Sequence, residues 1–181
     1  LKPKKILEVG THIGSSTLSI ALAAKKYNGK IDTIDIIDVN NKDLQYWSRF
    51  KSENSPEMNL KKSQCDQYVN FVTSNSINYL KNTEKKYDFI FLDGSHNSNQ
   101  VYIEVSYSLN LLEKNGVILL HDYFPNGKII WEETKKVIYG PYLALDRISK
   151  EGNDLKVLPL SNLPWETKFK SNKSSLAILF K

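Results

Sequence analysis

Short apolar segments alternate with segments of helical periodicity along most of the chain, and this alternation restricts the possible folds more than any other feature. The segments expected to form strands are 5–9, 30–37, 70–73, 87–92, 117–121, 156–160 and 175–180. The segments expected to form helices are 15–26, 43–51, 76–81, 99–112 and 129–138. Short, continuously apolar strands joined by helices are typical of a parallel sheet that helices cover on both faces.

The last two expected strands form an exception to this alternation. The residues between 156–160 and 175–180 are few and show little helical periodicity. A short connection of this kind joins antiparallel neighbours, whereas parallel strands need a longer crossover. We therefore predict a doubly wound α/β fold, in which a mostly parallel sheet of seven strands carries an antiparallel hairpin at one edge.

The length of 181 residues suits one domain with a core, so we expect a single domain over 1–181. The first residue is Leu1 rather than Met, and we expect the native N-terminus to be missing. No apolar run reaches the ~20 residues of a membrane span, and no signal peptide opens the sequence. Cys65 is the only cysteine, which excludes an internal disulfide and fits a reducing compartment. We expect a cytoplasmic protein without a membrane partner.

The charge of the chain restricts its partners. The net charge is +5, but Arg49 and Arg147 are the only arginines. Proteins that read nucleic acids rely on arginine for bidentate contacts, so a scattered lysine surface argues against a nucleic-acid partner. The sequence leaves open whether the chain forms a homo-oligomer.

The first expected strand runs into a turn that reads Glu8-Val9-Gly10-Thr11-His12-Ile13-Gly14-Ser15-Ser16. A dinucleotide fingerprint needs Gly-x-Gly-x-x-Gly, but His12 and Ser15 occupy its second and third glycine positions. The Gly-Lys-Ser/Thr of a phosphate-binding loop is also missing. The turn therefore suits a ligand that needs no phosphate cradle.

Acidic residues follow near the end of the second strand, where Asp35 is a better candidate than Asp38 because Asp38 falls beyond the expected strand end. Together with the turn, this pattern resembles motif I of the class I S-adenosylmethionine-dependent methyltransferases, which implies a Rossmann-like sheet. The resemblance implies that Glu8 binds the ammonium group of the cofactor, directly or through water, and that Asp35 binds its ribose hydroxyls.

The resemblance also implies an adenine contact at the end of the third strand, although Asn75 and Ser76 equally fit a helix cap. The residues expected to line the cofactor site are Glu8, Gly10, Thr11, His12, Gly14, Ser15, Ser16, Asp35, Asn75, Ser76 and Asp93.

A second group of polar residues follows the fourth and fifth strands. Asp93 and His96 lie in "DGSH", and His121 and Asp122 lie in "HDY". If these strands are parallel neighbours, both pairs lie at the cofactor edge of the sheet. The pattern resembles the macrocin-type and cephalosporin-pathway O-methyltransferases, which are distant relatives of the metal-dependent catechol and caffeoyl-coenzyme A O-methyltransferases. This resemblance covers residues 5–124.

The second resemblance implies specific roles for these four residues. Asp93, His121 and Asp122 would hold one divalent cation, and Asp93 would also take part in catalysis. Carboxylates suit Mg²⁺, whereas His121 favours a softer ion such as Mn²⁺, or orients a neighbour in a site without metal. His96 would be the general base that takes the proton of a hydroxyl group.

These features predict an enzyme: an S-adenosylmethionine-dependent O-methyltransferase acting on a hydroxyl of a small molecule, with sugars among the candidates. Two alternatives stay open. One is an α/β enzyme that binds NAD or a nucleotide sugar, and the other is a non-catalytic or RNA-binding relative with the same fold. We expect acceptor specificity to reside in the missing N-terminus and in segments 40–66, 123–128 and 162–174.

Overall fold

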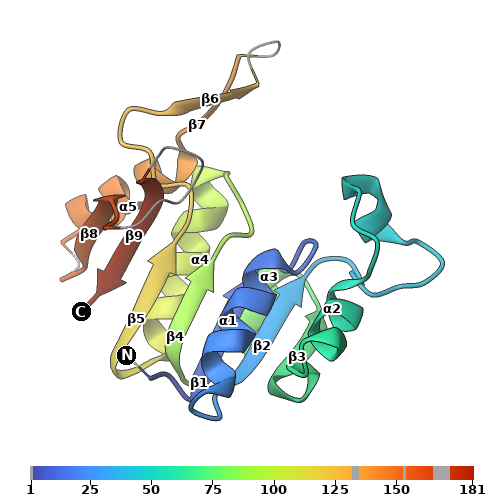
Figure 1. Cartoon of the computed structure of the whole chain (residues 1–181). Coiled ribbons are helices and arrows are strands. Elements are labelled where there is room, and N and C mark those ends of the chain that lie inside the picture. The colour runs from blue at the N-terminus through green and yellow to red at the C-terminus, as the bar shows by residue number, and fades with distance from the viewer. Residues whose placement is uncertain (1, 132–134, 153, 165–171) are drawn as a thin grey trace.

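The computed structural model describes the chain except residues 1, 132–134, 153 and 165–171 (Figure 1). A sheet of seven strands has the order β3-β2-β1-β4-β5-β9-β8. Its strands are β1 (Lys5–Val9), β2 (Lys30–Asp35), β3 (Val69–Thr73), β4 (Tyr87–Leu92), β5 (Leu112–Leu120), β8 (Lys156–Asn162) and β9 (Lys173–Phe180). The first five are parallel, while β9 is antiparallel to both β5 and β8. The predicted sheet and its edge hairpin are confirmed.

Helices cover both faces of this sheet. They are α1 (Ser15–Lys25), α2 (Pro56–Lys62), α3 (Ser76–Asn82), α4 (Ser98–Leu111) and α5 (Gly140–Lys150). The pair α1 and α2 packs on one face, and α3, α4 and α5 lie on the other (Figure 1). Two short 3₁₀ helices, η1 (Tyr46–Phe50) and η2 (Asp66–Tyr68), complete the segment between β2 and β3.

The central strand β1 is buried on both of its faces, and apart from Glu8 its buried residues are apolar. Ile6 packs with Ala21 and Ala24 of α1 in one cluster of the core. Leu7 and Val9 point to the opposite face and belong to the larger cluster under α4 and α5. Because side chains alternate along a strand, burial on both faces favours apolar residues at successive positions.

The register of the sheet aligns the ends of three neighbouring strands. Val9 lies opposite Leu92, and Leu92 lies opposite Leu120. Consequently Gly10, Asp93 and His121, which each follow one of these residues, leave the sheet at the same level. This edge, formed by the carboxyl ends of the strands, is where ligands bind in open parallel sheets.

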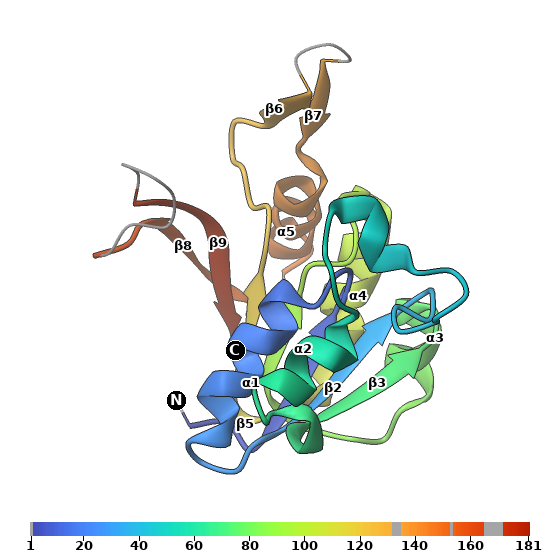
Figure 2. The same ribbon diagram turned by 45° about the vertical axis from the view of Figure 1, so that its right-hand side comes forward.

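The expected helix over 129–138 is wrong. The chain forms β6 (Lys128–Trp131) and β7 (Lys136–Ile138), which pair antiparallel and project from the main sheet (Figure 2). The segment contains Ile129, Val137 and Ile138, and β-branched residues favour strands. Residues 132–134 of the expected helix lie outside the described residues, as do residues 165–171 of the expected specificity segment 162–174.

Three further elements differ from the sequence expectation. The expected helix 43–51 is limited to the 3₁₀ helix η1. Helix α2 begins at Pro56 with Ser55 as its cap, in a segment for which the sequence predicts neither a helix nor a strand. Helix α5 was not predicted, although it buries Ala144, Leu145 and Ile148 against the core. Among the described residues, no helix has the length and apolar character needed to cross a membrane.

Candidate active site

The turn after β1 depends on two glycines. Gly10 has φ 99°, and a Cβ at this position would lie 2.5 Å from the backbone oxygen of Asp93. Gly14 has φ 77°, and a Cβ there would lie 2.7 Å from Pro56 of α2. Only glycine tolerates both the positive φ and the close approach of the neighbouring backbone. Gly10 therefore places the turn against the end of β4, and Gly14 places it against α2.

Glu8 lies beneath this turn and is fully buried. Its carboxylate accepts hydrogen bonds from the hydroxyl groups of Ser16, Thr17 and Thr33. Burial raises the pKa of Glu8, and the three hydroxyl donors partly offset this effect. A carboxylate without solvent access does not fit the expected direct contact with an ammonium group. In this structure Glu8 instead connects α1 and β2 to the turn.

A small hollow at the carboxyl edge of the sheet brings together several predicted cofactor residues. Its volume is about 110 Å³. The predicted residues that line it are Gly10, Asp35, Asn75 and Ser76, and the lining also includes Val9, Ile34, Ile36, Ser74, Gly94 and Gln100. Ile36, Ser74 and Gln100 were not predicted from the sequence, because no motif marks them. The hollow therefore gathers residues from β1, β2, α3 and α4 at one point.

Asp35 and Asn75 already take part in local hydrogen bonds beside the hollow. Asp35 accepts from the backbone N–H groups of His12, at 2.9 Å, and Ile37, at 3.3 Å. Asn75 accepts a hydrogen bond from the N–H of Asn78 and caps α3, which was the alternative to an adenine contact in the sequence analysis. The Asp35 carboxylate is half-buried and keeps lone pairs that can accept from a ligand.

The other predicted residues of the turn point in different directions. Thr11 is buried, and its hydroxyl is 2.6 Å from that of Thr33. Ser15 is exposed at the start of α1, and the side chain of Ser16 is bound to Glu8. The exposed ring of His12 packs against the rings of Phe50 and Tyr46 in η1, with centroid separations of 4.3 and 5.6 Å. The two η1 rings are an aromatic contact that sequence reasoning missed.

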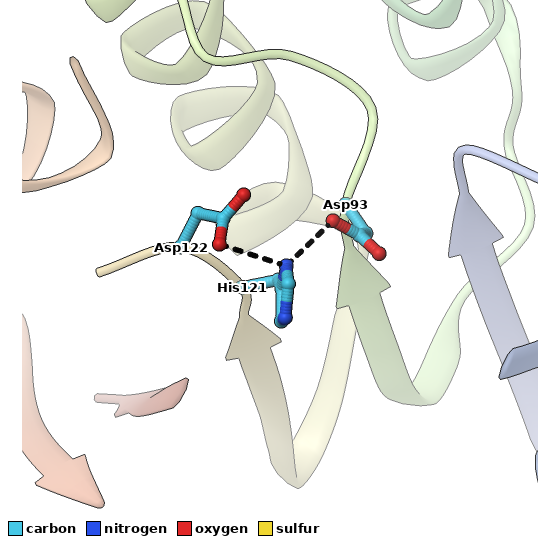
Figure 3. A group of neighbouring side chains, drawn as sticks. All are labelled: Asp93, His121 and Asp122. Carbon is cyan, nitrogen blue, oxygen red and sulfur yellow. Dashed lines mark ion pairs between the residues drawn. The ribbon is translucent and has the colours of Figure 1, made fainter. Parts of the chain in front are cut away.

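The polar residues after β4 and β5 meet as predicted from their position at adjacent strand ends. Nδ1 of His121 is 2.9 Å from Oδ1 of Asp93 and 3.3 Å from Oδ1 of Asp122 (Figure 3). The three donor atoms lie within 4.8 Å of one another. Asp122 has φ 55°, a strained conformation for a residue with a side chain. We refer to Asp93, His121 and Asp122 as the acidic cluster.

His96 joins the acidic cluster from the loop before α4. Its Nε2 is 2.7 Å from Oδ2 of Asp122, and half of its side chain is exposed. Gly140, the first residue of α5, packs against the backbone of this loop. A Cβ at Gly140 would lie 1.9 Å from the backbone oxygen of His96 and 2.8 Å from the nitrogen of Ser98. Nothing in the sequence marks Gly140 as a neighbour of His96, because the contact depends on how α5 packs.

Charge pairing dominates the electrostatics of the cluster. Burial alone would favour the neutral form of Asp122, but His121 and His96 outweigh it and hold the pKa of Asp122 well below its usual range. Burial also disfavours a charged His121, and the carboxylates of Asp122 and Asp93 overcome this effect and raise the pKa of His121 to about 10. Asp122 therefore stays ionised at neutral pH.

The cluster also has the donor chemistry of a cation site. Nδ1 of His121 is buried and, among the residues that the structure describes, has no hydrogen bond of normal geometry, despite its short distances to two carboxylates. A cation that displaced the proton from Nδ1 of His121 would meet a nitrogen lone pair and two carboxylate oxygens, and this set of ligands fits a divalent ion. Asp93, His121 and Asp122 are the residues that could hold it.

A larger cavity lies at the opposite edge of the sheet. Its volume is about 540 Å³, and it is lined by the amino ends of β1, β2, β3 and β4, with Lys5, Lys30, Asp32 and Tyr87 among its residues. None of the predicted site residues lines this cavity. The residues of the smaller hollow and of the acidic cluster lie instead at the carboxyl edge of the sheet.

The seven-stranded sheet, with its parallel strands and antiparallel β9, has the Rossmann-like methyltransferase fold. A model of the family described as "Methyltransferase domain" matches residues 7–123, and the chain belongs to this family. The match contains the glycine turn, Asp35 and the whole acidic cluster.

The relatives agree with this assignment. "Probable caffeoyl-CoA O-methyltransferase 3" of Dictyostelium discoideum is 29% identical over 164 residues, which cover 87% of this chain and 59% of that protein. The chain thus spans less than two thirds of this relative. The S-adenosylhomocysteine-bound Podospora anserina methyltransferase PaMTH1 aligns with 98% of this chain and 71% of its own, at 24% identity and a TM-score of 0.63. An O-methyltransferase from Bacillus cereus aligns with 99% of this chain and 75% of its own, at 16% identity and a TM-score of 0.66.

Proposed function

We propose that this protein transfers the methyl group of S-adenosylmethionine to a hydroxyl group of a small molecule. The observation that carries the proposal is the junction of the hollow with the acidic cluster. Gly94 lines the hollow, and Asp93, the preceding residue, belongs to the cluster. A methyl donor and a hydroxyl acceptor bound on either side of this junction are brought together at a single point.

The hollow supplies the groups that this donor requires. Asp35 accepts from the ribose hydroxyls, the turn from Gly10 to Gly14 follows the amino-acid portion, and Asn75 and Ser76 border the base. Glu8 acts beneath the turn, where it holds Ser16 and Thr17 in place. When bound, S-adenosylmethionine supplies the methyl group on a positively charged sulfur, which the negative charge of Asp93 favours.

Proton removal belongs to His96. Its Nε2 faces Asp122, so Nδ1 is the atom that accepts the proton of the acceptor hydroxyl. Asp122 orients the ring and stabilises the imidazolium that forms, because its own carboxylate stays ionised. Alignment of the hydroxyl oxygen with the methyl carbon supplies the rest of the rate enhancement.

We further propose that Asp93, His121 and Asp122 hold a divalent cation such as Mg²⁺ or Mn²⁺. When bound, the cation would lower the pKa of the acceptor hydroxyl and hold its oxygen beside the cluster. The similarity to probable caffeoyl-CoA O-methyltransferases favours a hydroxyl acceptor, and sugar hydroxyls are among those this site would accept. Activity that survives removal of metal by a chelator would contradict the proposal that these residues hold a cation.

Calorimetry with S-adenosylhomocysteine tests the proposed donor site. We expect saturable binding, and the variant Asp35→Asn is expected to weaken it about tenfold, because the stronger charge-assisted acceptor for the ribose is lost. Asp38→Asn is the matched control: Asp38 is exposed three residues further on and is expected to leave the affinity unchanged. Absence of binding to the unaltered protein at millimolar concentration would reject the proposal.

A further inference from the structure

A buried carboxylate lies behind the hollow without touching it. Glu104, on α4, is 1% exposed. It lies one helical turn after Gln100 and opposite Ser76, the first residue of α3. Gln100 and Ser76 both line the hollow, whereas Glu104 does not. Glu104 therefore reaches the hollow only through these two side chains.

The hydrogen bonds among the three residues fix the direction of one amide group. The hydroxyl of Ser76 donates to Oε1 of Glu104 at 2.6 Å. Nε2 of Gln100 donates to the same oxygen at 3.0 Å and to Oγ of Ser76 at 3.4 Å. A glutamine amide has two N–H donors, and these contacts use both. The carbonyl oxygen of Gln100 is the part of the amide that remains for a ligand.

A carboxylate in this position is costly to the fold. Burial raises the pKa of Glu104, and the bonds from Ser76 and Gln100 offset the effect only in part. An apolar residue would pack between α3 and α4 without this desolvation penalty. An ionised carboxylate accepts hydrogen bonds and donates none, so it holds the NH₂ group of Gln100 inward in a way that a neutral amide does not.

We propose that Glu104 is a positioning residue that makes the hollow selective for adenine through Gln100, an inference that rests on the proposed function. The outward carbonyl of Gln100 accepts a hydrogen bond from the exocyclic amino group of adenine. Hypoxanthine carries a carbonyl oxygen at the same ring position. Two facing carbonyl oxygens repel each other and leave both acceptors unpaired.

The test compares the affinities of S-adenosylhomocysteine and S-inosylhomocysteine, measured by calorimetry. The unaltered protein is expected to prefer the adenine compound by about tenfold or more, as sites built around a specific hydrogen bond do. In Glu104→Gln the amide of Gln100 is free to turn, so the preference is expected to fall below about threefold. Gln100→Met removes the amide while keeping similar bulk. This variant is expected to abolish the preference although Glu104 itself is not substituted.

The control is Glu57→Gln, which alters a partly exposed glutamate on α2 that pairs with Lys61 and does not line the hollow, and it is expected to keep the full preference. The readout is a ratio of two affinities, so a uniform loss from loosened packing does not imitate the effect. A preference that persists in Glu104→Gln or in Gln100→Met, or that is missing from the unaltered protein, overturns the inference. Failure of the unaltered protein to bind either compound rejects the proposed function itself.

Discussion

At the scale of single residues, the site depends on carboxylates whose roles differ because their surroundings differ. Glu8 is sealed under the glycine turn by three hydroxyl groups. Asp35 stands at the edge of the hollow, and Asp122 lies between two histidines. The sequence identifies all three as site residues, but it does not reveal which of them a ligand can reach, because burial depends on distant parts of the chain.

Replacement of His96 by alanine tests the assignment of the base. We expect kcat to fall by about 10²–10⁴, the usual contribution of a positioned general base, while the affinity for S-adenosylhomocysteine stays unchanged. Single-turnover kinetics with an identified acceptor, together with calorimetry, measure the two quantities. Ser95→Ala on the same loop is the control, and turnover that survives the loss of His96 would rule out its role as base.

Asp32 provides a prediction about stability and pH that does not involve the active site. It is 9% exposed, lies 2.9 Å from Nζ of Lys85, and accepts from Asn70 and Tyr87. Burial alone would favour the neutral acid, but these hydrogen bonds and the charge of Lys85 outweigh it and lower the pKa of Asp32. Ionised Asp32 therefore stabilises the fold above the pKa of an unfolded aspartate, and this contribution is lost as the pH falls through the lower pKa of the folded state.

We accordingly expect Asp32→Asn to reduce the free energy of unfolding at pH 7 by about 1–3 kcal/mol, the value of hydrogen bonds to a charged group. The deficit is expected to shrink below about pH 4, where unfolded aspartates become protonated. Urea denaturation at pH 7 and pH 3 measures both quantities, with the exposed Asp38→Asn as control. A deficit of equal size at both pH values would contradict this account.

At the scale of secondary structure, α5 supports the loop that carries His96, although this helix is distant in sequence from the motifs. Its first residue, Gly140, packs directly against the loop that carries His96. The helix is anchored to the core by Ala144, Leu145 and Ile148, so the contact is held by the rest of the fold. The position of His96 relative to Asp122 therefore depends on a helix that follows the matched segment 7–123.

Gly140→Ala tests this dependence. Its added Cβ would lie 1.9 Å from a backbone oxygen, so the loop or the helix must move. We expect a loss of about 1–3 kcal/mol in stability, as for other overpacked positions, and a larger loss in kcat than in affinity for S-adenosylhomocysteine. Ser149→Ala, on the exposed face of the same helix, is the control. Unchanged kcat in Gly140→Ala would show that α5 does not position the loop.

The elements that the sequence predicted well are those whose pattern is local. The strands β1 to β5 and the edge hairpin follow from apolar runs and the turns between them. The hairpin of β6 and β7 was mistaken for a helix, because residues 129–138 carry apolar side chains that fit either period. Gln100 and Glu104 were missed for a different reason: their contact with Ser76 arises only when α3 and α4 pack together.

At the scale of the whole molecule, the two edges of the sheet carry different features. The carboxyl edge combines the hollow, the acidic cluster and His96, whereas the amino edge holds the larger cavity of about 540 Å³. Parallel strands explain this separation, because every loop that follows a strand emerges at the same edge. In this account a single adenosyl ligand occupies the carboxyl edge, and the larger cavity is not part of the methyl-transfer site.

The most direct test is a crystal structure of the protein with S-adenosylhomocysteine. We predict that the adenosyl group lies in the hollow between Asp35 and Gln100, with the sulfur directed toward Asp93. A ligand bound at the amino edge beside Lys30 and Tyr87, or one whose sulfur faces away from the Asp93–His121–Asp122 cluster, would contradict the account.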